Sequence, residues 1–209
     1  KSFLALYSKS RFRGKRMDKS VRRSNVAKRF LEHANALRAE KTTFQGYLAL
    51  RNMFGLTFLL GSEVGVRAAK TYYEEILQRA EIPCRKRILW VHFAPLFAHD
   101  IMRYFEEQLG CIIAFDITAH VYWDTLDETD WVSTLADKLL SHFYLGDGKR
   151  RMDLIVRLIE QYRMDGIVLY MHQGCRAIAG SVWEFKYLSE ARKIPFLELH
   201  GDCIAPDGV

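Results

Sequence analysis

The residues of this sequence best suited to chemistry are cysteines and histidines that directly follow short apolar runs. His172-Gln173-Gly174-Cys175-Arg176 follows the apolar run 166–171, and His200-Gly201-Asp202-Cys203 follows the run 195–199. A cysteine thiolate can bind iron or act as a nucleophile, and a histidine can carry a proton near neutral pH. The sequence therefore offers a candidate site for metal or acid–base chemistry, with Cys175 as its first candidate ligand.

Two further apolar runs also end in polar side chains. The run 87–92 ends at His92, and the run 111–115 is followed by Asp116. If all four runs are parallel strands, their carboxyl ends share one edge, which is where open α/β sheets bind ligands. Helix caps and turns would account for each polar segment taken singly. Their coincidence at one edge is what favours a functional site.

The remaining cysteines fit a different role. Cys84 precedes an apolar run and Cys111 opens one, so both belong at the opposite edge, where a buried or incidental thiol is the simpler interpretation. The sequence contains no C-x-x-C pair, which argues against a zinc ribbon, a ferredoxin-type run and a thioredoxin-like redox pair. It also lacks G-x-G-x-x-G and the P-loop pattern, so no classical nucleotide site is indicated.

The elements that must position these residues fall into two regions. Residues 1–82 read as a helical segment, with helices predicted over 20–40, 42–53 and 62–82, the last with Ser62 as its N-cap. Residues 83–209 read as strands alternating with helices. Strands are predicted at 87–92, 111–115, 166–171 and 195–199, and helices at 96–109, 131–144, 149–163 and 177–193.

This alternation predicts the fold class. Continuous apolar runs are typical of strands buried on both faces, and parallel neighbours need crossover connections. We expect an α/β protein: a helical N-terminal segment, then a Rossmann-like parallel four-stranded sheet flanked by helices, with the first strand central. The chain starts at Lys1 and stops just after a strand, so we expect the α/β domain to be truncated at both chain ends.

Composition and charge restrict the classes of function. The chain has 209 residues, 49% hydrophobic and 27% charged, and no apolar run long enough for a membrane span, so we expect no membrane partner and a cytoplasmic location. Residues 1–38 hold 12 Lys and Arg against 2 Asp and Glu. Such an arm could bind nucleic acid or acidic lipid, but its helical periodicity makes a solvated helix face the better interpretation. We therefore expect no nucleic-acid partner.

Taken together, several motifs resemble a known family. Asp165-Gly166-Ile167-Val168, His172–Arg176 and Ile194–Asp202 resemble the C-terminal segment of 2-hydroxyacyl-CoA dehydratase subunits, a superfamily that includes benzoyl-CoA reductase subunits. His120-Val121-Tyr122-Trp123 and Leu135-Ala136-Asp137-Lys138 are similar to that family's order of features. The resemblance extends over most of the chain, and the His-x-Gly-Cys-Arg element with the later Gly-Asp is its most specific part.

The resemblance implies an oxygen-sensitive enzyme subunit with a [4Fe–4S] cluster that pairs with a homologous subunit. An ATP-dependent iron–sulfur activator protein supplies one electron, a CoA-thioester substrate becomes a ketyl radical, and water is eliminated from the 2-hydroxyacyl-CoA. Cys175 matches a cluster-ligand position, and other ligands come partly from an N-terminal domain absent from this sequence. Some relatives carry a cysteine where this chain has Thr118, and Cys203 is a weaker candidate ligand.

The remaining roles follow from position. His172 and His120 are candidate catalytic proton carriers, and Arg176, Trp123 and Asp202 are candidate substrate-binding residues, with Arg176 suited to a CoA phosphate. Loop hydrogen bonds, aromatic packing and turn capping are the structural alternatives for these residues. The alternative functions are a benzoyl-CoA-reductase-like subunit and a noncatalytic assembly subunit of such a complex.

Overall fold

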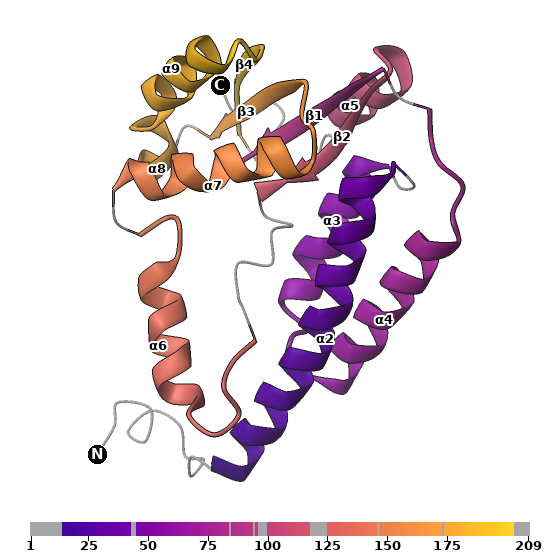
Figure 1. Cartoon of the computed structure of the whole chain (residues 1–209), viewed down its shortest axis with the longest axis vertical. Helices are drawn as coiled ribbons and strands as arrows, with labels where there is room; N and C mark the ends of the chain where they lie inside the picture. Colours follow the sequence, from indigo (N-terminus) through magenta and orange to yellow (C-terminus); the bar gives the residue numbers. More distant parts are fainter. Residues whose placement is uncertain are drawn as a thin grey trace.

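The computed structural model describes residues 14–42, 45–83, 85–93, 95, 100–117, 125–145, 147–172 and 174–202. Figure 1 shows a helical segment beside a small sheet with helices on its two faces. The helical segment contains α2 (Gly14–Glu40), α3 (Gly46–Thr57) and α4 (Glu63–Gln78), and it precedes the sheet as expected. No helix in these described ranges is long and apolar enough to cross a membrane.

The strands alternate with helices along the chain, and all four strands of the sheet run parallel. The elements are β1 (Lys86–Val91), α5 (Asp100–Arg103), the π-helix η1 (Tyr104–Gln108), β2 (Cys111–Asp116), α6 (Trp131–Ser141), α7 (Gly148–Gln161), β3 (Gly166–His172), α8 (Arg176–Ala179), α9 (Val182–Arg192) and β4 (Phe196–Gly201). The strand order is β2-β1-β3-β4, which confirms the predicted fold class and the central place of the first strand.

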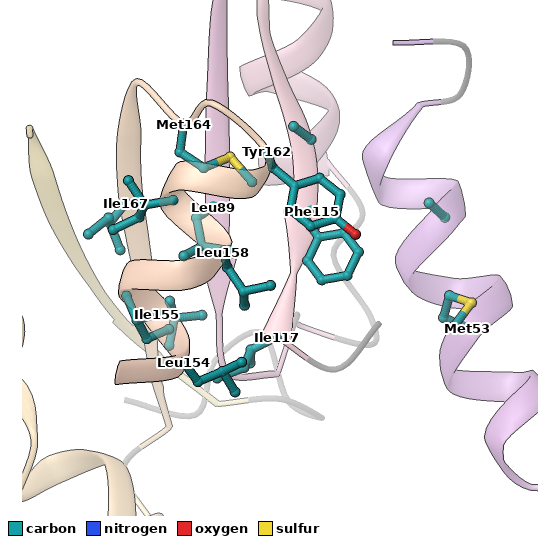
Figure 2. Close-up of a cluster of buried hydrophobic side chains, with 14 of the residues drawn as sticks. Met53, Leu89, Phe115, Ile117, Leu154, Ile155, Leu158, Tyr162, Met164 and Ile167 are labelled. Atoms are coloured by element: carbon teal, nitrogen blue, oxygen red, sulfur yellow. The ribbon is translucent and has the colours of Figure 1, made fainter. Parts of the chain in front are cut away.

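Alternating side chains of each strand build two cores. Leu89, Ile167 and Leu169 face α7 and the helical segment, whereas Ile88, Trp90 and Val168 face α5, η1 and part of α3. Figure 2 shows the first core, where Ile155 and Leu158 of α7 lie over the strands. The stripe Leu154, Ile155, Leu158 and Ile159 repeats at three- and four-residue spacing, which is why this segment forms an amphipathic helix with its apolar face on the sheet.

One of the contacts between the helical segment and the sheet is made by a partly buried carboxylate. Glu106 Oε1 accepts hydrogen bonds from the backbone N–H of Gly46, 2.7 Å away, and of Ile113, 3.1 Å away. The first bond holds the start of α3 and the second covers an N–H of the edge strand β2. A Cβ on Gly46 would collide with the Ile113 carbonyl, so only glycine allows this close approach.

Several predicted helix boundaries differ from those of the structure, and three of them concern the helices nearest the sheet and the site. α3 begins at Gly46 rather than at residue 42, because Glu106 binds its first turn from outside the helix. α4 ends at Gln78 rather than at 82, although Ser62 caps it as predicted, its Oγ accepting from the Gly65 N–H at 2.9 Å. The helix predicted over 177–193 is broken into α8 and α9 at Gly180 and Ser181.

Candidate functional site at the sheet switch point

The connections between strands create a switch point between β1 and β3. From β1 the chain passes through α5 and η1 to β2 on one side, and from β3 it passes through α8 and α9 to β4 on the other. The carboxyl ends of the two central strands therefore diverge into loops that leave in opposite directions, which is where doubly wound sheets bind ligands. His92 directly follows β1, and His172 is the last residue of β3.

His172 and Asp202 lie together at this edge. The His172 Nε2 atom is 3.8 Å from Asp202 Oδ2, which is an ion-pair distance rather than a hydrogen bond. The Gly174 backbone N–H donates to His172 Nδ1 at 3.1 Å. A neutral His172 must therefore carry its proton on Nε2, the nitrogen that faces Asp202. Both side chains remain partly exposed, so a ligand can reach them.

Backbone contacts hold Asp202 in this place. The Tyr170 hydroxyl donates to the Asp202 carbonyl oxygen at 2.7 Å, and the Tyr170 ring stacks on Trp90 with centroids 6.0 Å apart. A Cβ on Gly201 would collide with the Tyr170 hydroxyl, so the last position of β4 requires glycine. The backbone that carries Asp202 is thus tied to the core, while its carboxylate faces the site.

Cys175 lies on the same loop as His172. Its backbone N–H donates to the His172 carbonyl oxygen at 3.0 Å, and its half-buried side chain packs against the core that contains α7. Cys175 is the N-cap of α8, but α8 is only four residues long. The contribution of a helix dipole to this thiol is therefore that of about one turn.

His92 is the buried histidine of the site. Its side chain is almost fully buried, its backbone has a φ of 74°, and its Nδ1 atom lies 3.1 Å from the Tyr170 carbonyl oxygen. This contact joins the end of β1 to β3 across the switch point. Burial lowers the pKa of His92 below its ordinary value, and the charges of His172 and Arg151 act in the same direction.

Arg151 brings a buried positive charge close to this site. It occupies a core position of α7, its Nη1 atom donates to the Ser181 hydroxyl, and its guanidinium lies 5.3 Å from the centroid of the Tyr144 ring. Sequence reasoning passed over this residue because it lies within the charged run 149–151. A usable signal was its spacing, since Arg151 precedes Leu154 and Ile155 on the apolar stripe of α7.

The remaining candidate residues do not all lie at this site. His120, Trp123, Thr118, Cys84 and Cys203 lie outside the described residues. Arg176 is exposed directly after Cys175, where a ligand can reach it. His200 is exposed and pairs with Glu198 on its own strand at 2.9 Å, so it does not join the site. Asp116 is buried beside Tyr72 and Tyr162 under the helical segment; burial raises the pKa of both phenols, and the charge of Asp116 acts in the same direction.

The described residues offer few grouped side chains that could bind a metal ion. Within the described ranges no three His, Cys, Asp or Glu side chains are grouped closely enough to hold a metal ion. Of the two described cysteines, Cys111 opens β2 at the amino edge, and Cys175 follows β3 at the carboxyl edge. The described part of the chain thus offers one thiol at the site, and iron–sulfur clusters are held mainly by several.

Comparison with known proteins agrees with the residue pattern. Residues 1–208 match the family model described as 2-hydroxyglutaryl-CoA dehydratase, D-component. No curated protein matches the chain at a significant level.

Proposed function

The chain belongs to the 2-hydroxyglutaryl-CoA dehydratase D-component family, and from this premise we propose that it is a catalytic subunit of a 2-hydroxyacyl-CoA dehydratase. The enzyme would remove water from a 2-hydroxyacyl-CoA to give the corresponding enoyl-CoA. The observation that carries this proposal is the family match over almost the whole chain. The ion pair of His172 and Asp202, together with the position of Cys175 after the same strand, supports it, because this edge of the sheet then carries a histidine, a carboxylate and a thiol.

For the cofactor, we propose that Cys175 supplies one thiolate ligand to a [4Fe–4S] cluster. The remaining ligands would come from outside the described residues, with Cys203, which follows β4 in the sequence, as one candidate. A bound cluster would supply one-electron chemistry and an open iron for a substrate oxygen. The partly exposed position of Cys175, next to the mouth of the switch point, is compatible with this shared ligand set.

Proton handling falls to His172 in this proposal. Its Nδ1 accepts from the Gly174 N–H, so the neutral ring presents Nε2–H as a donor to the departing hydroxyl or to the thioester carbonyl. Asp202 would orient the ring and stabilise it when protonated. His92, kept neutral by burial, would hold the ends of β1 and β3 in register rather than carry protons.

Recognition and activation of the substrate would involve one residue of this site together with other proteins. Arg176 lies exposed beside Cys175 and would pair with a phosphate of the CoA portion. The name D-component denotes one part of a larger enzyme, so a paired subunit belongs to the proposal. An ATP-dependent iron–sulfur activator would deliver the electron that starts the reaction.

One observation favours a second candidate, a noncatalytic assembly subunit. The described residues place a single thiol at the site, and Thr118 stands where some relatives have cysteine. In that case the sheet would serve assembly, and the cluster would belong to the paired subunit alone.

Metal analysis of cysteine variants separates the two candidates. Iron and acid-labile sulfide are measured per chain on the full-length protein, purified without oxygen, as wild type, Cys175→Ser and Cys111→Ser. Cys111 is the matched control, because it is a free cysteine at the opposite edge of the same sheet. We expect about four iron atoms per chain for a [4Fe–4S] protein, a sharp loss in Cys175→Ser and none in Cys111→Ser. Equal iron in all three proteins removes Cys175 from the site, and no iron in a folded wild type supports the assembly role.

A further inference from the structure

Three phenylalanines form an aromatic wall at the carboxyl edge of the sheet. The ring of Phe54 makes edge-to-face contacts with Phe58, at a centroid distance of 5.2 Å, and with Phe93, at 6.3 Å. Phe58 is 74% exposed and Phe93 is 43% exposed. Phe93 lies just after β1, and its carbonyl oxygen accepts a hydrogen bond from Trp90 Nε1 at 3.3 Å. The wall therefore has a fixed backbone and open aromatic surface, which is what an apolar ligand group requires.

Helix α3 carries the wall from the core of the sheet to its edge. Tyr47 and Leu50 of α3 pack against the core that faces α5, and Phe54 and Phe58 continue this row at three- and four-residue spacing. The helix packs on β2 and α5 (Figure 1). It begins beside the middle of β2 and reaches Phe93, beyond the end of β1, eight residues later. The apolar row thus runs out of the core and onto the carboxyl edge.

His172 opens onto the same side of the sheet as this wall. Val168 and Tyr170 of β3 belong to the core that faces α5, and because side chains alternate along a strand, His172 continues their row. His92 joins the two features, since its ring lies 4.8 Å from the Phe93 ring and its Nδ1 atom lies 3.1 Å from the Tyr170 carbonyl oxygen. Neighbouring strands lie about 5 Å apart. A ligand held by His172 therefore has the wall within reach of a branched or aromatic side chain.

We propose that the aromatic wall binds the side chain of the 2-hydroxyacyl group, so that the substrate class is a 2-hydroxyacyl-CoA with an apolar side chain. This inference rests on the proposed function, in which His172 donates to the hydroxyl or to the thioester carbonyl. Arg51, the basic residue of α3, lines the groove between α3 and α4 instead of the wall. A second carboxylate, as in a 2-hydroxyglutaryl group, would lose its hydration against the phenylalanine rings without gaining a cationic partner from them.

Thioester binding to the full-length protein, in complex with its paired subunit and purified without oxygen, tests this specificity. Calorimetry gives the dissociation constants of 2-hydroxy-4-methylpentanoyl-CoA, 2-hydroxyglutaryl-CoA and free CoA. We expect the wild type to bind the methylpentanoyl thioester more tightly than the glutaryl thioester, on the order of tenfold. Phe58→Ser with Phe93→Ser should abolish this difference and leave the affinity for free CoA unchanged. Tyr187→Ser is the control, because Tyr187 is an equally exposed aromatic side chain on α9, and it should preserve the difference.

A second variant keeps the test decisive if the double substitution unfolds the protein. Phe58→Arg changes only the most exposed ring of the wall, and its new cation should shift the ratio of the two affinities about tenfold toward 2-hydroxyglutaryl-CoA. A ratio that does not respond to Phe58→Arg contradicts the assignment of this surface.

The remaining outcomes separate this inference from the proposed function. Equal affinities for the two thioesters, or a wild-type preference for 2-hydroxyglutaryl-CoA that Arg51→Gln removes, overturn the inference and leave the dehydratase proposal standing. Substitutions in the wall that weaken binding of the paired subunit but not the discrimination between thioesters also overturn it, and assign the wall to the subunit interface. A wild type that binds neither thioester contradicts the proposed function itself.

Discussion

Replacing Glu106 with glutamine should remove a pH dependence of stability that this carboxylate introduces. Burial raises the pKa of Glu106 to about 7, although the N–H groups of Ile113 and Gly46 and the charge of Arg38 oppose the shift. The folded protein therefore holds this proton more tightly than the unfolded chain, whose glutamates titrate near 4.5. The stabilisation is complete below pH 4.5 and is lost as the pH rises through about 7.

The size of the effect follows from the difference between the two pKa values. A separation of roughly 2.5 pKa units corresponds to about 3 kcal/mol of unfolding free energy. Glutamine keeps an oxygen that can accept the two backbone hydrogen bonds but does not titrate. Between pH 5 and pH 8, the free energy of unfolding of the wild type should therefore fall by about 2.5 kcal/mol relative to Glu106→Gln, because part of the stabilisation is already lost at pH 5.

Urea unfolding at pH 5, 6, 7 and 8 measures this difference directly. Glu107→Gln is the control, because Glu107 lies next in the same π-helix but is exposed and pairs with Arg103. The difference between wild type and Glu107→Gln should stay nearly constant with pH. A difference between wild type and Glu106→Gln that is equally flat would refute the reasoning, since Glu106 would then titrate alike in both states.

Two further pairs of substitutions, each a test and its control, probe the packing described above by urea unfolding. Gly46→Ala should destabilise the fold by about 1–3 kcal/mol, because the new Cβ meets the Ile113 carbonyl; Gly55→Ala in the same helix has open space and should stabilise by about 0.5–1 kcal/mol. The opposite result for either glycine would contradict the close approach. Ile155→Ala should lower the free energy of unfolding by about 2–4 kcal/mol, since this side chain of α7 is fully buried against the sheet. Arg157→Ala, at an exposed position of the same helix, should change it by less than about 0.5 kcal/mol.

The strands and their order along the chain could be predicted because each is indicated by an apolar run within one short segment. The apolar runs predicted as strands, such as 87–92 and 166–171, agree within a residue or two with β1 and β3. A strand buried on both faces must be apolar throughout, so its composition reveals it. The start of α3 could not be predicted, because Glu106, 60 residues away in the chain, supplies the partner for its first turn.

The helix break after β3 illustrates the same limit. The run 177–193 predicts one helix, yet the chain turns at Gly180 and Ser181 before α9 begins. The Ser181 side chain is buried and accepts a hydrogen bond from Arg151 of α7. The turn therefore has a partner 30 residues away, which periodicity along a single segment cannot reveal.

Sequence reasoning could predict that the strand ends gather but not which histidine remains accessible. His92 and His172 both follow apolar runs of similar composition, and both end central strands of the sheet. In the fold, His92 turns inward with a positive φ and is almost fully buried against the Tyr170 carbonyl, whereas His172 faces Asp202 at the surface. Burial favours the neutral form of the His92 ring, whereas the His172 ring is partly exposed and within reach of a ligand. These two environments depend on tertiary contacts of Tyr170 and Asp202, which hold the end of β4 beside β3.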